Sequence, residues 1–449
     1  MIFLLDVILA LNLVLAYFLF RNILAPPMLM GLGMFGASAI ASSYFQEWEL
    51  NTMMLESVML LGGSTLLFTI VCYIFRQRKI YKPSSLVAKN ITLSQIHTKR
   101  VERILFLLVI CGFLSCVLKI RYYESFFGSS LALSELIHEA RFDSWSGENT
   151  LHLPKYILWL SNIGAFAQCF SSWLLAIYIV SKNKNRRLCV LLIAQILTVV
   201  VNGMLGGTKG AMLDPIMRFL TIYLFVLFAK RQSFVLPVKT VFIILIAFAS
   251  FAVGFRSING LIGRNVEWKD NSDMLSVYMG AQIKNFDIYM HGADGNKENL
   301  FVGEETFWGI YRSIYSDYIR QPRQFQEVRN SSLGNVYTQV YSFHKDFGVV
   351  GVVLLTALMA FISMITYNRA KRTIINPMRL RLSLIVYAYM TMPIFMSFFS
   401  SRFSEQILTP IFLKQLVYIW IILLLFNRFI VKRNTQKNEQ VIINNNSNV

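Results

Sequence analysis

The sequence predicts an all-α polytopic integral membrane protein with about eleven transmembrane helices. Of its 449 residues, 55% are hydrophobic and only 15% are charged, whereas soluble domains carry about 25% charged residues. Its apolar residues gather in runs of the length that crosses a bilayer, about 20 residues each. This composition excludes disordered, collagen-like and disulfide-scaffold proteins.

Charged residues separate the apolar runs and so mark where each helix is expected to end. The expected helices lie near residues 2–20, 25–44, 53–75, 104–120, 156–180, 188–204, 211–229, 240–255, 347–367, 382–399 and 410–427. The flanking cation of the first run, Arg21, follows it, and no small-residue cleavage site comes after it, which predicts a retained span. All five cysteines fall inside apolar runs and act there as small hydrophobes.

The distribution of cations predicts the orientation of the helices. One set of alternate connections holds 25 Lys and Arg against two acids, Glu102 and Glu439. Short cytoplasmic loops collect cations, so we expect an exported N-terminus and a cytoplasmic C-terminus. Residues 1–433 are expected to form one transmembrane domain, and the Asn-rich residues 434–449 a disordered tail. These loops account for the net charge of +19, and no basic stretch interleaved with aromatics indicates nucleic-acid binding.

Two long exported loops are the candidates for chemistry. In the first, 121–155, Ser129 and Ser130 precede apolar residues at helical spacing, which predicts a capped amphipathic helix on the membrane interface. The second, 256–345, holds ten cations and ten acids and is too long to lack structure. Its segment 273–289 predicts another interfacial helix, and we expect this loop to form a cap over a membrane-facing cavity.

Cations on the exported side are informative because the orientation rule disfavours them there. Guanidinium groups bind phosphate oxygens in bidentate fashion, so the set suits a lipid-linked diphosphate. The candidates are Arg141, Lys209, Arg256, Arg264, Arg312, Arg320, Arg323, Arg329 and Arg402. Arg256 directly follows an apolar run and Arg402 lies in a short turn between two spans, where charge is costly.

The segment from Asn202 to Asp214, NGMLGGTKGAMLD, is rich in glycine and joins two spans on the exported side. Glycine allows close backbone approach, and amides at the start of the next helix could receive an anion beside Lys209. Its spacing differs from that of a nucleotide-binding P-loop. A tight turn that needs glycine for backbone reasons alone is the alternative.

Candidate general acids or bases are Asp214, Glu304, Glu305, Asp317, His344 and Asp346, because a carboxylate or imidazole can take a proton from an acceptor hydroxyl. Trp268, Trp308 and Tyr311 are candidates for stacking on sugars. The exported loops contain no DxD or ExD pair, so we expect no metal and no cofactor.

The pattern resembles the bacterial oligosaccharide repeat-unit polymerases, the Wzy-type polymerases of O-antigen, capsule and enterobacterial common antigen. The resemblance covers most of the chain as a pattern: about a dozen spans, a large late exported loop, the GGTKGA turn, and NVYTQVYSFHKDFGVVGVV leading into a span. Some members carry an arginine followed by ten residues and a glycine in a periplasmic loop, and Arg323 to Gly334 has that spacing.

The resemblance implies a GT-C-like, metal-independent glycosyltransferase of the bacterial inner membrane. Undecaprenyl-diphosphate-linked oligosaccharides would be joined at the periplasmic face, and undecaprenyl diphosphate would leave. The exported arginines would then hold the diphosphate and stabilise its developing charge. The bilayer, a flippase and a chain-length regulator are the further partners implied.

Three other functions fit the sequence less well. The related O-antigen ligases typically carry a histidine before the asparagine of the late segment, where this chain has Gly334 and Asn335. A flippase or other transporter would have polar residues within its spans and short exported loops. A scaffold subunit would leave the arginine cluster unexplained.

Overall fold

The computed structural model describes residues 1–77, 96–146, 151–207, 209–243, 246, 249, 257, 260, 271–295, 298–315, 323–329, 331–374 and 377–429. Within these ranges the chain is helical apart from turns and one antiparallel hairpin, β1 (Gln326–Val328) and β2 (Ser331–Gly334). The predicted all-α membrane fold is therefore confirmed in its class.

The longer helices follow the apolar runs. Their bounds are α1 (Ile2–Phe20), α2 (Pro26–Ser43), α3 (Leu55–Ile74), α5 (Thr98–Phe127), α6 (Leu133–Ser146), α7 (Lys155–Val180), α8 (Arg186–Met204), α9 (Lys209–Arg231), α14 (Gln339–Lys371), α15 (Leu382–Phe395) and α17 (Pro410–Phe429). Shorter helices are α11 (Asn271–Met279), α12 (Ala281–Met290), α13 (Glu304–Ile314) and α16 (Arg402–Gln406).

Eight of the described helices are long and apolar enough to cross a membrane: α1, α3, α5, α7, α8, α9, α14 and α17. α15 is a shorter apolar helix, and α2 forms where a span is predicted. Most of the predicted span 240–255 lies outside the described residues. The count of eleven therefore stays a prediction.

The surface of the bundle carries broad apolar faces. Phe3, Leu11 and Phe18 of α1 are 58%, 65% and 67% exposed, and α5, α14 and α17 present similar rows. Soluble monomers rarely expose apolar patches of this extent. These faces are the surface that lipid would cover.

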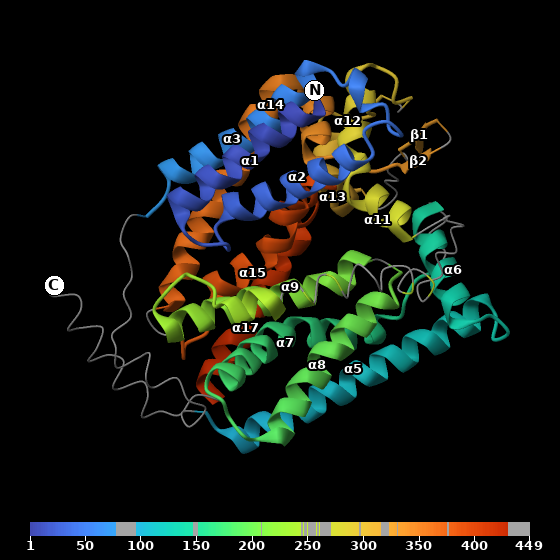
Figure 1. Cartoon of the computed structure of the whole chain (residues 1–449). Coiled ribbons are helices and arrows are strands. Elements are labelled where there is room, and N and C mark those ends of the chain that lie inside the picture. The colour runs from blue at the N-terminus through green and yellow to red at the C-terminus, as the bar shows by residue number, and fades with distance from the viewer. Residues whose placement is uncertain are drawn as a thin grey trace.

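Two groups of helices pack against α15. α1, α2, α3 and α14 form one group, and α5, α7, α8 and α9 form the other, as Figure 1 shows. α16 and α17 follow α15 in the chain, and α16 packs against α13.

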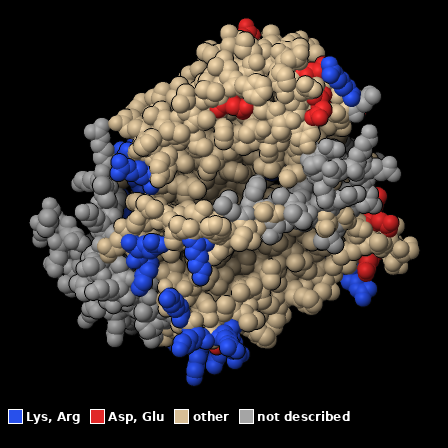
Figure 2. All heavy atoms as spheres, viewed as in Figure 1, with Lys and Arg blue, Asp and Glu red and all other residues tan. Residues whose placement is uncertain are grey.

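The two ends of the bundle differ in charge. Most Lys and Arg side chains on the face shown in Figure 2 lie at its lower left, whereas acidic side chains lie at the top and right. Contacts join the helix ends at the cation-rich end, where Asn22 Nδ2 donates to the Tyr367 hydroxyl at 2.7 Å. At the opposite end, Met54 N and Ser57 Oγ both donate to Asp287 of α12 at 2.9 Å. Each of these contacts joins two segments that the sequence places on the same side of the membrane.

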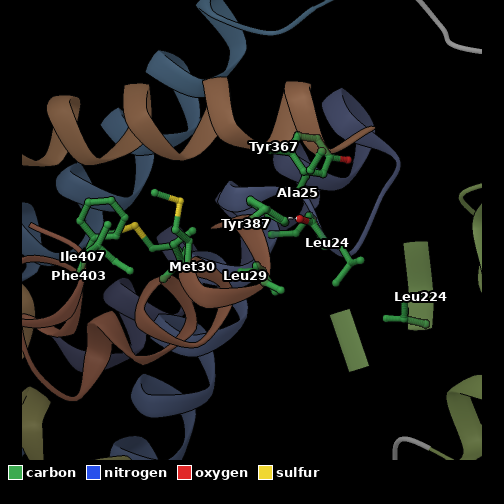
Figure 3. Close-up of a cluster of buried hydrophobic side chains, with 14 of the residues drawn as sticks. Leu24, Ala25, Leu29, Met30, Leu224, Tyr367, Tyr387, Phe403 and Ile407 are labelled. Carbon is green, nitrogen blue, oxygen red and sulfur yellow. Dashed lines mark hydrogen bonds between the residues drawn. The ribbon is translucent and has the colours of Figure 1, made fainter. Parts of the chain in front are cut away.

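The hydrophobic core reaches α16 and holds it in place. Phe403 and Ile407 are 1% and 7% exposed, and they lie beside Met30 of α2 in Figure 3. In the same core the Tyr387 hydroxyl donates a hydrogen bond to the Leu24 carbonyl. Burial of a large aromatic side chain fixes the short helix, and so fixes its polar neighbours Arg402 and Glu405.

The two predicted interfacial helices form, but protein covers their apolar faces. In α6, Leu136 and Ile137 are 2% and 0% exposed, and Ile137 packs against Cys116 and Leu205. The segment 273–289 is broken into α11 and α12 at Gly280, where a Cβ atom would lie 2.9 Å from Ala41 N of α2. Close packing on α2 therefore interrupts the expected helix.

Candidate functional site

Three segments meet at one end of the bundle. They are the turn between α8 and α9, α16 itself, and α13 with Arg323. We call the charged residues gathered there the α16 cluster: Asp214, Arg218, Glu305, Arg323, Arg402 and Glu405. The cluster brings together Arg323 and Arg402 of the predicted arginine set, the acids Asp214 and Glu305, and two further residues, Arg218 and Glu405.

Glycines shape the turn between α8 and α9. Gly207 has a φ of +67°, a left-handed conformation that favours glycine. A Cβ on Gly203 would lie 2.4 Å from the Ala211 carbonyl. Pro215 lacks the amide that would bond to this carbonyl within α9. Glycine thus lets α8 approach a carbonyl that proline has left without its helical donor.

Arg402 lies against the first turn of α9. A Cβ on Gly210 would be 3.3 Å from Arg402 Nη1, so only glycine leaves room for the guanidinium at its present position. The Arg402 Cζ atom is 5.8 Å from the centroid of the Phe399 ring. Within the described part of the chain, the buried Arg402 Nε atom has no hydrogen-bond acceptor. One donor of this guanidinium is therefore unsatisfied.

Two further charges of α9 extend the cluster into the bundle. Asp214 interacts electrostatically with both Arg218 and Arg402. Arg218 Nη1 donates to Gln168 Oε1 at 3.3 Å, and its Cζ lies 4.2 Å from the centroid of the Tyr389 ring. Two guanidinium groups thus share one carboxylate beside the glycine turn.

Arg323 and Glu305 form a buried ion pair on the other side of α16. Arg323 Nη2 and Nε lie 2.5 Å and 3.1 Å from Glu305 Oε2, and their side chains are 9% and 7% exposed. Burial disfavours the charged guanidinium, but the attraction and hydrogen bond of Glu305 outweigh it and raise the pKa of Arg323 above its ordinary value. Glu405 of α16 adds to this attraction.

Tyrosine rings support the Arg323 guanidinium. Its Cζ atom lies 5.1 Å and 5.5 Å from the ring centroids of Tyr341 and Tyr337, a cation–π arrangement. The two rings stack on each other with centroids 4.1 Å apart. Arg323 is therefore held at a fixed position by its carboxylate and by aromatic faces together.

Glu304 and Asp346 bind backbone amides at the start of α13. Asp346 accepts hydrogen bonds from Glu305 N at 3.2 Å and Thr306 N at 2.6 Å. Glu304 accepts from Leu300 N at 2.6 Å. A carboxylate at a helix N-terminus stabilises the helix. These two candidate bases thus have a clear structural role in positioning Glu305.

Two aromatic rings, Tyr289 and Tyr341, lie between His344 and the Arg323–Glu305 pair. Its Nδ1 atom is 3.0 Å from the Tyr289 hydroxyl, and the Tyr289 ring packs edge-on against Tyr341. Burial, together with the acids Asp294 and Asp346, raises the pKa of Tyr289 to about 12. Tyr289 therefore stays neutral near pH 7 and can exchange a hydrogen bond with the imidazole.

The remaining predicted cations do not all join the cluster. The stem of Arg141 packs on the glycine turn, where a Cβ on Gly207 would lie 3.1 Å from it. Lys209 is the first residue of α9, and Arg312 is exposed in the last turn of α13. Arg329 Nε lies 2.6 Å from Glu49 Oε1 at the surface.

Five predicted site residues lie outside the described residues, and the other two aromatic candidates belong to α13. Those outside are Arg256, Arg264, Asp317, Arg320 and Trp268. Trp308 is half-buried, and the Tyr311 hydroxyl donates to the Val302 carbonyl at 2.7 Å.

Arg218 is absent from the predicted site residues, although its position in the sequence marks it as a candidate. Arg218 lies within the predicted span 211–229, and a charge inside a span is costly and marks a candidate site. Glu405 could not be recognised in this way, because the sequence places it in a short turn, where acidic residues are common.

Comparison of the chain with protein-family models, with curated proteins and with solved structures gives no match. The function proposed next is supported by the residues of this chain and by the pattern they form.

Proposed function

We propose that the chain polymerises undecaprenyl-diphosphate-linked oligosaccharides at the periplasmic face of the bacterial inner membrane. The growing glycan would be transferred from its lipid diphosphate to a new lipid-linked unit. In this orientation the cation-rich end of the bundle faces the cytoplasm and the α16 cluster faces the periplasm.

The observation that supports the proposal most directly is the environment of the Arg402 guanidinium. Its guanidinium lies beside Gly210 and the Phe399 ring, shares Asp214 with Arg218, and has a buried Nε without an acceptor among the described residues. Preorganised donors and excess positive charge are what a departing diphosphate requires. Lys209 begins α9 at the same turn, and Arg141 of α6 packs on that turn, so both bring positive charge to it.

The transfer would break the bond between the sugar C1 and the diphosphate oxygen and form a bond from C1 to an acceptor hydroxyl oxygen. The diphosphate keeps the electron pair of the broken bond, and Arg402 and Arg218 stabilise its charge. The hydroxyl proton passes to a base. Glu305 and His344 are two described candidates whose partners are side chains rather than backbone amides.

A small apolar crevice adjoins the cluster. It lies between α13, α14 and α16, and its lining includes Thr306, Phe343, Leu355, Phe403 and Ser404. Thr306 follows Glu305, and Phe403 follows Arg402, so polar and apolar parts of the site adjoin.

The experiment that tests the proposal is deletion of the gene in its host, followed by gel separation of the surface glycolipid. Complementation with the wild-type chain should restore a ladder of polymer lengths. Complementation with Arg402→Ala, at equal protein level, should leave a lipid core that bears a single repeat unit.

Two results would overturn the proposal. Loss of every attached unit with accumulation of lipid-linked polymer would indicate a ligase. Accumulation of single lipid-linked units on the cytoplasmic face would indicate a flippase.

A further inference from the structure

An exposed aromatic patch lies beside α13, on the side away from the buried Glu305. Its members are Leu300, Phe301, Val302, Tyr311, Ile314 and Tyr315. Leu300, Val302 and Ile314 are 64%, 80% and 65% exposed. Exposed apolar clusters of this kind mark interaction surfaces.

The three rings of the patch lie nearly parallel to one another, offset from one another. Their centroids are 5.3 Å, 6.3 Å and 6.5 Å apart, and their planes are within 19° of parallel. In a stacked column of three rings, the centroids of the two outer rings would lie about twice as far apart as those of adjacent rings. The nearly equal distances therefore describe a triangle of rings whose faces point in the same direction.

The patch adjoins the point where α14 becomes lipid-facing. A Cβ on Gly303 would lie 3.0 Å from the Phe347 ring, and the rings of Phe307 and Phe347 are 6.3 Å apart. α14 bends at Gly348, which has a φ of +60°. Beyond the bend its exposed face is apolar, with Val349 and Val350 at 55% and 67% exposure.

The backbone of the patch is suited to a medium poor in water. Glu304 accepts from the amides of Leu300 and Phe301 at 2.6 Å and 3.4 Å. Tyr311 donates to the Val302 carbonyl. Unsatisfied backbone groups are costly near lipid, and here side chains of α13 satisfy three of them.

We infer that this aromatic patch lies in the outer interfacial layer of the membrane and binds lipid there. Aliphatic tips, aromatic rings and the exposed Arg312 of the same helix are the composition of an interfacial anchor. A sugar platform would instead surround its rings with polar side chains. The anchor sets the start of α13, and with it the Glu305–Arg323 pair, near the depth of lipid phosphates. The inference requires that the chain cross a membrane, and it does not depend on polymerase activity.

Spin labels in proteoliposomes of phosphatidylethanolamine and phosphatidylglycerol test the inference. The label is attached to Val302→Cys, and the labelled wild type supplies the background signal of the native cysteines. Glu327→Cys, exposed on β1, is the control for water, and Val350→Cys is the control for lipid. The accessibility of each label to oxygen and to a neutral nickel chelate is measured by electron paramagnetic resonance.

The ratio of oxygen to nickel accessibility at Val302 should exceed that at Glu327 several-fold and stay below that at Val350. Ile314→Cys should behave as Val302→Cys does. Ratios at both positions equal to that at Glu327 would overturn the inference, and a fall in nickel access only on adding oligosaccharide would indicate a glycan platform instead.

Discussion

At the scale of single residues, the α16 cluster holds its two exported arginines in different ways. Arg323 has a carboxylate 2.5 Å away and two tyrosine rings. Arg402 has an aromatic ring and shares a carboxylate with Arg218. We therefore expect substitution of Arg323 or its partner Glu305 to affect folding, and substitution of Arg402 to affect function.

Replacing Glu305 by Gln should destabilise the protein strongly. The change leaves the buried Arg323 guanidinium without its carboxylate, and breaking a buried pair in this way costs about 3–5 kcal/mol. The melting temperature in detergent measures the effect. The double variant Glu305→Gln/Arg323→Gln removes both charges and should recover part of the loss, whereas equal melting of Glu305→Gln and wild type would show that the pair contributes little.

Replacing Arg402 should lower the rate of transfer with little effect on melting. Loss of one preorganised donor to a developing anion costs about 10²–10³-fold in rate, which we expect for Arg402→Ala in an assay with lipid-linked oligosaccharide. Arg402→Lys should fall between Ala and wild type, since an ammonium cannot bind bidentately. Full activity of Arg402→Ala would exclude it from the site.

At the scale of elements, α16 is a five-residue helix whose position depends on its neighbours. Phe403 anchors it in the core, and α13 approaches closely at Gly309, where a Cβ would lie 3.1 Å from the Glu405 carbonyl. On the other side of α16, Gly210 of α9 lies against the Arg402 guanidinium. Small residues at these two contacts allow the helices to meet.

Gly210→Ala should reduce polymer synthesis several-fold without lowering the melting temperature. The added methyl would lie 3.3 Å from Arg402 Nη1, so the guanidinium must shift by a few tenths of an ångström, and small displacements of a binding group slow a reaction. Gly63→Ala in α3 is the matched control, because nothing lies within 4 Å of its new Cβ. Equal activity of the two variants would contradict the assigned contact.

Helices could be predicted from the sequence because lipid requires every backbone group to be bonded within its own span. α1 and α8 begin and end within two residues of their apolar runs. The α16 cluster could be predicted less fully than the helices. Glu305 and Arg323 are eighteen residues apart and share no periodic pattern, and the break at Gly280 depends on packing against α2, distant in the sequence.

At the scale of the whole molecule, charge asymmetry between the two ends predicts the topology. Lys184 is exposed in the connection between α7 and α8, and Glu327 is exposed on β1. Both positions can therefore take a cysteine without disturbing the core.

A membrane-impermeant maleimide should label Glu327→Cys when the outer face of the inner membrane is accessible, and Lys184→Cys only after that membrane is permeabilised. The wild type controls for native cysteines, which lie within apolar helices. Labelling in the reverse order would invert the bundle and move the α16 cluster to the cytoplasmic side.

The contacts that join distant parts of the chain also set the order in which it can be assembled. Asn22 contacts Tyr367, which is synthesised 345 residues later, and Met54 contacts Asp287, which is synthesised 233 residues later. At synthesis rates of about 5–20 residues per second, the first of these intervals lasts roughly 20 to 70 s. During that time α1, α2 and α3 reside in the bilayer while Asn22 Nδ2 still lacks its Tyr367 acceptor, so this contact can form only once the last third of the chain is being synthesised.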